Sequence, residues 1–252
     1  AAIVVLVYIG IYIPIALGLV SFVSVWIMSG KSILAFNFLK IAVGDGVTEY
    51  NFATIPLFTL MGLLVSKAGL GRDIYDVMNS TFRKVLAGIG MATVGANAVF
   101  AAITGSSIAS ASVFTKISVP EMLRYNYNKR FAVGVVAGSS VLGMIIPPSA
   151  MLIIYSFISE QSVGDMFLAG IVPGLLLTGA YIFAIFTMAR IWPSYIGQDI
   201  KADEMPALDT SETIHKAWPV IALIFLVLGG IYTGWLTPVE AGAAGASLAL
   251  VI

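Results

Sequence analysis

Two stretches carry residue types that could bind a small cation or an anion inside an otherwise apolar chain. The first, TGSSIASAS at 104–112, sets hydroxyls and small side chains between two apolar arms. The second, VLGMIIPPSAMLIIY at 141–155, sets two adjacent prolines where an apolar helix should run unbroken. Serine oxygens and backbone carbonyls are hard ligands of the kind that small hard cations prefer. We expect the two stretches to face each other and to form half of an ion and substrate site.

In the first stretch, Gly105 permits a close turn, and Ser106 and Ser107 offer hydroxyl oxygens. The alternative for each serine is close helix packing, which is the commoner use of small residues in membrane helices and suits Ser110 and Ser112.

In the second stretch, Pro147 and Pro148 lack N–H donors, so carbonyls in the turn from Gly143 onward lose their helical partners. The half-helix that begins near Ser149 presents free N–H groups and a positive dipole end to an anion. The alternative is a simple proline kink. The coincidence of this break with a hydroxyl-rich tip favours the broken-helix pattern of secondary transporters.

The composition is that of a polytopic membrane protein. The 252 residues are 59% hydrophobic and 10% charged, whereas soluble domains carry roughly 25% charged residues. Basic and acidic residues balance at 13 each, without a basic run, so nothing indicates nucleic-acid binding. The sequence has no Cys for disulfides or thiol chemistry, and its one His, His215, is interpreted as solvated in a polar loop rather than as a metal ligand.

Membrane spans need about 20 apolar residues each. On this rule the predicted spans are 2–28, 51–68, 131–158, 166–188 and 217–235, with another that starts at about 238. The shorter apolar segment at 33–43 is predicted to be an interfacial helix. The segment 71–86, with apolar Ile74, Val77 and Met78 on one side, is predicted to be a surface amphipathic helix. No charged residue lies in the middle of a span, which favours coupling to Na⁺ through neutral oxygens over a proton relay.

Basic residues in short loops indicate the cytoplasmic side of the membrane. Two such loops flank the segment 87–118, and their residues are Lys67, Arg72, Arg83 and Lys84, then Lys116, Arg124, Lys129 and Arg130. The turn at 159–165 has acids and no base, so it is predicted to lie outside. The segment 87–118 should therefore begin and end in the cytoplasm, as a re-entrant hairpin of two half-depth helices with its tip near TGSS. A single tilted helix is the alternative, but it would place one basic loop outside.

From about residue 50 to its end, the chain resembles the DctM-like large permease subunit of tripartite ATP-independent periplasmic (TRAP) transporters. The matching stretches are IPLFTLMGLLVSKAGLGRDIYD, FAAITGSSIASASVFTKISVPEM, GSSVLGMIIPPSAMLIIY, VGDMFLAGIVPGLLL and LTPVEAGAAGA. The resemblance implies an all-α polytopic membrane protein and an elevator-type secondary transporter, of which this chain holds the first of two inverted repeats. It implies Na⁺-coupled uptake of an organic acid, such as a C4-dicarboxylate, a sialic acid or a keto acid, across the bacterial inner membrane.

The resemblance also implies partners and a division of the chain. The partners are a periplasmic substrate-binding protein (DctP-like) and a small four-helix membrane subunit (DctQ-like), separate or fused, within the lipid bilayer. The implied regions are scaffold helices with the interfacial helix at 1–84, half of the transport domain at 85–190, a cytoplasmic loop at 191–216, and a scaffold helix with the start of the second repeat at 217–252.

The site residues follow from the same resemblance. In this family the first hairpin tip and the following broken helix bind Na⁺, which implies the ligands Gly105, Ser106, Ser107, Gly143, Pro147 and Pro148. For the substrate we expect Thr104, Ser106, Ser107 and Ser149. The sequence starts without Met and stops inside an apolar run, so we expect the natural protein to extend beyond both ends. The second Na⁺ site and the rest of the pocket should lie in that missing half, and the 252 residues alone should not transport.

Three other functions remain as alternatives. A binding-protein-independent symporter of divalent anions and Na⁺ shares broken hairpins with this pattern. An intramembrane hydrolase that uses Ser106 or Ser107 is disfavoured, because the only His lies in a polar loop and no GxSxG motif is present, so we predict that the protein is not an enzyme. A passive channel or structural subunit is the third.

Overall fold

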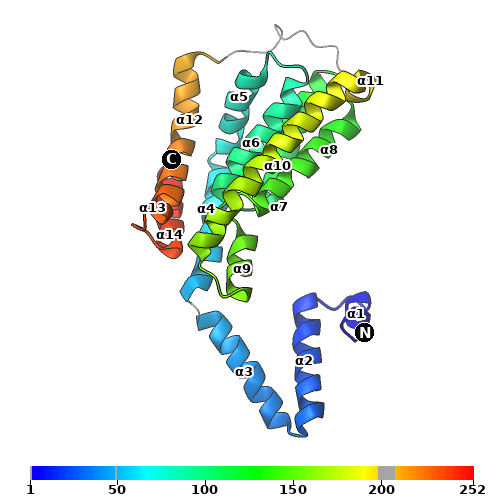
Figure 1. The fold of residues 1–252 in the computed structure, drawn as a ribbon, viewed down its shortest axis with the longest axis vertical. Helices are drawn as coiled ribbons and strands as arrows, with labels where there is room; N and C mark the ends of the chain where they lie inside the picture. Colours follow the sequence, from blue (N-terminus) through cyan, green and yellow to red (C-terminus); the bar gives the residue numbers. More distant parts are fainter. Residues whose placement is uncertain (1, 49, 198–207) are drawn as a thin grey trace. The chain divides into compact units, whose positions relative to one another are not determined.

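The computed structural model describes residues 2–48, 50–197 and 208–252. Most of these residues are helical, and no strand occurs among them (Figure 1). The chain divides into two compact units, Ala1–Phe52 and Ala53–Ile252. The predicted all-α class is therefore confirmed.

The helices described in the first unit are α1 (Ala2–Tyr8), α2 (Ile13–Ser29) and α3 (Ser32–Thr48). The prediction of one span over 2–28 is wrong. Gly10 takes a φ of +95°, a left-handed conformation that ends the first helix and that glycine adopts without steric cost. Pro14 then sits in the first turn of α2, where a missing N–H is tolerated. Helix α3 covers the predicted interfacial segment 33–43 and extends beyond it at its C-terminal end.

A short 3₁₀ turn, η1 (Tyr50–Ala53), precedes the second unit. The elements of that unit are, in chain order, α4 (Thr54–Lys67), α5 (Leu70–Phe82), α6 (Gly88–Thr104), α7 (Ser107–Arg124), α8 (Lys129–Ser140), the 3₁₀ turn η2 (Val141–Met144), α9 (Ala150–Ile158), α10 (Val163–Ile191), α11 (Pro193–Ile196), α12 (Thr210–Ile224), the π-helical turn η4 (Phe225–Gly229), α13 (Gly230–Tyr232) and α14 (Pro238–Val251).

Helix α6 is the central element of the second unit. It packs against α4, α5, α7, α8 and α10, and almost all of its side chains are buried (Figure 1). Glycine and alanine make up much of α6, and small residues allow neighbouring helices to approach closely. A Cβ atom added at Gly95 would lie only 3.1 Å from the sulfur of Met78 on α5. The small residues of α6 therefore decide how tightly its neighbours pack.

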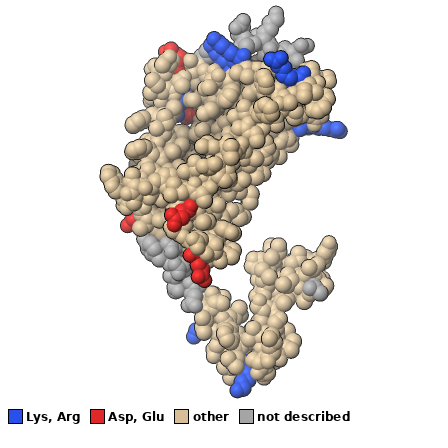
Figure 2. All heavy atoms as spheres, viewed as in Figure 1, with Lys and Arg blue, Asp and Glu red and all other residues tan. Residues whose placement is uncertain are grey.

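Among the described residues, two continuous helical segments are long and apolar enough to cross a membrane, Val163–Ile191 and Thr210–Tyr232. Helices α4 and α5 would form a third such segment if they are counted as one span bent by 67°. The lengths thus support a membrane protein, although several predicted spans are divided into shorter helices. On the face shown in Figure 2, Lys and Arg gather at the end of the second unit near α11. Acidic residues appear at the same end, beside the start of α12, and also at the opposite end near α9.

Helix α5 is amphipathic as predicted, but it is not a surface helix. Ile74 and Tyr75 are each 3% exposed, and α5 packs on both α6 and α12. It ends at Phe82 rather than at residue 86, and the chain turns before Ala87, whose left-handed conformation precedes α6. The turn is so tight that a Cβ on Gly88 would overlap the carbonyl oxygen of Phe82.

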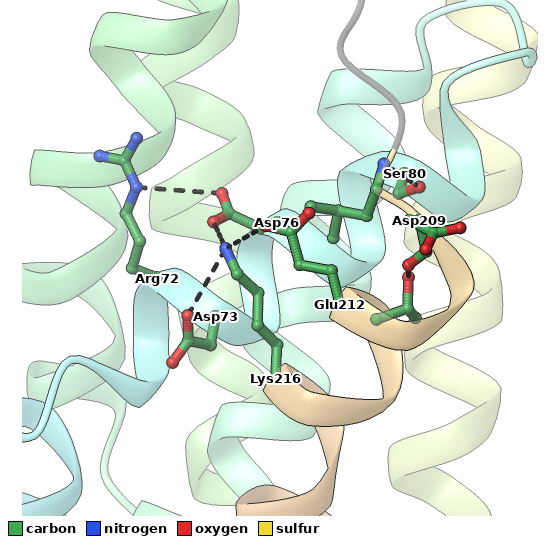
Figure 3. A network of polar contacts seen from close by, with 9 residues as sticks. Arg72, Asp73, Asp76, Ser80, Asp209, Glu212 and Lys216 are labelled. Atoms are coloured by element: carbon green, nitrogen blue, oxygen red, sulfur yellow. Dashed lines mark hydrogen bonds and ion pairs between the residues drawn. The ribbon is translucent and has the colours of Figure 1, made fainter.

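Helix α12 starts at Thr210, well before the predicted span 217–235. The prediction that His215 lies in a polar loop is wrong, because His215 is an exposed residue of this helix. Figure 3 shows the contacts that hold the polar first turns of α12. The Lys216 side chain extends from α12 to the carboxylates of α5. Its Nζ lies 2.5 Å from Asp76 Oδ2 and 3.7 Å from Asp73 Oδ1. Within the predicted loop 191–216, α11 is helical as well, and 198–207 lie outside the described residues.

Candidate functional site

Helices α6 and α7 are joined by only two residues, Gly105 and Ser106, and run side by side as a hairpin (Figure 1). Gly105 ends α6 with a φ of +59°, and its N–H donates to Ala101 O at 3.0 Å. Ser106 is extended and begins α7, where its Oγ accepts from the Ala109 N–H at 3.3 Å. The hydroxyl-rich tip is thus a helix C-cap followed at once by an N-cap. Helix α7 continues to Arg124, beyond the predicted hairpin end at 118.

The predicted broken helix 131–158 is broken in the structure. Helix α8 ends at Ser140, η2 follows, and α9 begins only at Ala150. In a continuous helix, Met144 O would accept from the N–H of residue 148, but that residue is a proline. The Ser149 hydroxyl donates to Met144 O instead, at 2.7 Å. One of the carbonyls expected to be free is therefore satisfied locally.

The tip and the break lie against each other through their backbones. The Ala150 N–H donates to Gly105 O at 3.3 Å. A Cβ on Gly105 would overlap the Pro148 carbonyl oxygen, and a Cβ on Gly143 would lie 2.8 Å from the Ser107 nitrogen. Only glycine allows this approach on either side. The hydrogen bond from Ala150 also occupies one of the N–H groups at the N-terminus of α9, which we had expected to be free to bind an anion.

The hydroxyls around this contact retain acceptor capacity. Thr104, 3% exposed, donates its Oγ1 hydrogen to Phe100 O at 2.9 Å, as buried Ser149 does to Met144 O. A hydroxyl oxygen that donates its hydrogen keeps lone pairs for a cation. The Ser107 side chain makes no hydrogen bond to any described residue. The stretches 104–112 and 141–150 contain no Asp, Glu, His or Cys, so the side-chain oxygens that they offer to a cation are neutral.

A groove of about 380 Å³ opens beside the tip, between α4 and the two hairpin arms. Its lining includes the hydroxyl-bearing residues Thr59, Ser66, Thr104, Ser106 and Ser112. Of the four residues expected to bind substrate, Thr104 and Ser106 line the groove, whereas Ser107 and Ser149 do not. Thr59 and Ser66 were not predicted, because sequence spacing alone does not place α4 opposite the hairpin.

Asn97 is a second residue that the sequence reasoning missed. It is fully buried in α6, and its Nδ2 donates to Ser139 Oγ on α8 at 2.8 Å and to Thr93 O at 3.2 Å. Its Oδ1 has no hydrogen-bond partner among the described residues. Ser139 stands just before η2, so Asn97 ties the hairpin to the helix that leads into the break. An asparagine within an apolar run was the available signal.

Comparison with known proteins identifies the family of this chain. Residues 1–252 match the family described as the tripartite ATP-independent periplasmic transporter, DctM component. The C4-dicarboxylate TRAP transporter large permease protein DctM of Pseudomonas aeruginosa is 32% identical over 235 residues, which cover 92% of this chain and 52% of that protein. The protein of the same name from Vibrio cholerae is 33% identical over 242 residues, covering 94% of this chain and 51% of that protein.

More distant relatives have other names. The sialic acid TRAP transporter large permease protein SiaM of Vibrio cholerae is 27% identical over 216 residues, covering 86% of this chain and 49% of that protein. The chain thus spans about half the length of these curated relatives. The match to the family model nevertheless extends over the whole chain, and the apolar helices fit an integral membrane protein. The chain therefore belongs to the DctM family, the large permease component of tripartite ATP-independent periplasmic transporters.

Proposed function

We propose that this chain forms one half of a Na⁺-coupled secondary transporter that carries an organic acid across the bacterial inner membrane. The observation that supports this proposal is the backbone contact between the hairpin tip and the helix break. Two interruptions of regular structure meet at one place, and both need glycine to do so. Irregular backbone at membrane depth is tolerated only where protein covers it or where it lines a wet cavity.

In this proposal the Na⁺ ligands come from the two sides of that contact. They are Gly105, Ser106 and Ser107 at the tip, and Gly143, Pro147 and Pro148 at the break. When bound, Na⁺ supplies a positive charge to a site whose side chains are neutral. The chain holds the backbone of the two breaks together, and the caps at Gly105 and Ser106 fix the direction of the tip before any ion arrives.

The substrate is proposed to be a carboxylate that uses the hydroxyl-lined groove beside the tip. Thr104 and Ser106 belong to both the tip and the groove, so an anion there would lie close to the bound cation. The names of the relatives specify C4-dicarboxylates, sialic acid and 2,3-diketo-L-gulonate. Ser107 and Ser149 are proposed as further substrate contacts.

The partners are proposed from the family. A small membrane subunit and a periplasmic binding protein complete the transporter, and one relative, the isethionate TRAP transporter permease protein DctMQ, carries a combined name. The family match favours this reading over the binding-protein-independent symporter, and the relatives named here are permeases rather than enzymes. An elevator movement, with 85–190 as half of the mobile domain against the scaffold regions 1–84 and 217–252, is part of the proposal.

The experiment that tests the proposal is Na⁺-dependent uptake by the full-length complex in proteoliposomes. Ser106→Ala and Ser107→Ala each remove one oxygen ligand. A ligand to a charged group is worth roughly 1.5–3 kcal/mol, so the Na⁺ concentration for half-maximal uptake should rise about ten- to a hundredfold. Pro147→Ala supplies an N–H that lets the helix turn close and withdraws a carbonyl, so the same rise is expected.

The matched control is Ser247→Ala. Ser247 is exposed on α14 and bonds only to Ala243 O of its own helix, at 2.8 Å. If the three site variants keep the parental half-saturation while the complex assembles normally, the serines are packing residues and the assignment of the ion site is wrong.

A further inference from the structure

A groove lies between α8 and α10, and none of the proposed Na⁺ ligands lines it. Both helices pack on α6 but make few contacts with each other, so Val94 of α6 forms the floor between them. The walls are largely apolar, with Phe131 and Val135 on one side and Ala184 and Met188 on the other. The volume of the groove is about 210 Å³.

Glycines on α8 keep this groove open. A Cβ atom added at Gly134 would meet no atom within 4 Å, and one at Gly138 would approach only the ring of Tyr181, at 3.7 Å. In a helix of a membrane protein, such an open glycine usually allows another helix to pack closely. Here no described helix occupies the space beside Gly134.

One end of the groove is charged and aromatic. Arg130, in the first turn of α8, lines the groove, is exposed, and makes no ion pair with any described residue. Tyr195 of α11 lines the same end. This end belongs to the part of the second unit where Lys and Arg gather in Figure 2. Arginine pairs with phosphate through two parallel hydrogen bonds, and tyrosines are enriched at the level of lipid headgroups.

From this arrangement we infer that the α8–α10 groove binds one anionic phospholipid of the surrounding bilayer. The phosphate lies at Arg130, and one acyl chain lies along Gly134 and Gly138 over Val94. Basic pockets between membrane helices on the cytoplasmic side are suited to anionic headgroups. The inference is independent of the ion site, because it needs only that this groove faces the lipid of a membrane.

The test uses the full-length complex in nanodiscs of phosphatidylglycerol and phosphatidylethanolamine in equal amounts. Lipid that stays bound after gentle extraction is measured by native mass spectrometry. We expect retained phosphatidylglycerol to exceed phosphatidylethanolamine. Arg130→Gln should lower the ratio of retained phosphatidylglycerol to phosphatidylethanolamine about tenfold, since a hydrogen bond to a charged group is lost. Gly134→Leu, whose side chain has room to enter the groove, should displace the lipid altogether.

Two controls match these variants. Gly179→Leu adds the same side chain at an exposed glycine of α10 that also has open space around it but does not line the groove. Lys84→Gln removes an exposed charge elsewhere among the basic loops. Neither change should alter lipid retention. Equal retention in Gly134→Leu and Gly179→Leu would overturn the inference, as would equal retention of the two phospholipids by the parent.

A cross-linking measurement keeps the inference testable if Gly134→Leu does not assemble. A photoreactive phenylalanine at Ala184, which is exposed and lines the groove, should link to phospholipid. A link to a protein segment of the complex instead would show that another helix fills the groove, and the inference would be wrong.

Discussion

Replacing Gly105 by alanine should weaken Na⁺ binding without unfolding the protein. The residue has a φ of +59°, and a left-handed conformation costs an L-residue roughly 1–2 kcal/mol. The new methyl group would also overlap the Pro148 carbonyl, so the tip must move away from the break and lose the Ala150 N–H···O Gly105 bond. That bond is worth about 1 kcal/mol. The combined cost is about 2–3 kcal/mol.

In the variant the methyl group holds the tip away from the break, and this cost should appear mainly in the ion-bound state, because Na⁺ ligands from both sides require the tip and the break to meet again. The Na⁺ concentration for half-maximal uptake should then rise about 30- to 150-fold at 1.4 kcal/mol per decade. The half-saturating Na⁺ concentration is measured from uptake by the full-length complex in proteoliposomes. Gly179→Ala is the control, because a Cβ atom at Gly179 has open space around it. Unchanged Na⁺ half-saturation in an assembled Gly105→Ala complex would show that the backbone contact does not shape an ion site.

Four further outcomes follow from the described contacts. Asn97→Ala removes the buried bonds between α6 and α8, and should lower stability by about 1–3 kcal/mol; an unchanged melting temperature of the complex would contradict this. Lys216→Met removes the ion pair of Asp73 and leaves Asp76 only its pair with Arg72, and should cost about 1 kcal/mol or less at low salt and less still at high salt; a loss that does not depend on salt would refute the reasoning. Single cysteines at Lys84 and Arg124 should both react with a reagent applied from the cytoplasm, and reaction of either from outside would end the re-entrant model. His215→Ala should leave transport intact, and reduced uptake at normal expression would argue for a role of this exposed side chain.

The tip and the break were predictable from sequence because their chemistry is local. A glycine between two apolar arms ends one helix through its own left-handed conformation, and Ser106 begins the next by capping it. Two prolines interrupt the helical hydrogen bonds wherever they occur. What the sequence did not indicate is how the break is closed, since a bond from Ser149 to Met144 O spans five residues of irregular backbone.

The errors came from counting apolar residues without considering torsion angles or tertiary contacts. Residues 2–28 satisfy the length rule for a span, but a single left-handed Gly10 divides them. The first two turns of α12 look like a loop because they are polar, yet they are held by ion pairs of Lys216 to a helix 140 residues earlier in the chain. Asn97 was not predicted because it is uncharged, and only charged residues inside spans were taken as a sign of function.

The contacts of the hairpin suggest which parts could move together. Its tip is bound to the break by backbone contacts that leave no room even for a methyl group, so α6, α7 and α9 should move as one body. Its other side faces α4, where a Cβ at Gly62 would stand 3.2 Å from Thr104 Cβ. That second contact also borders the hydroxyl-lined groove. A slide of the hairpin along α4 would therefore leave the proposed ion ligands together while it reshapes the groove, which is what a carrier needs to release its substrate on the far side.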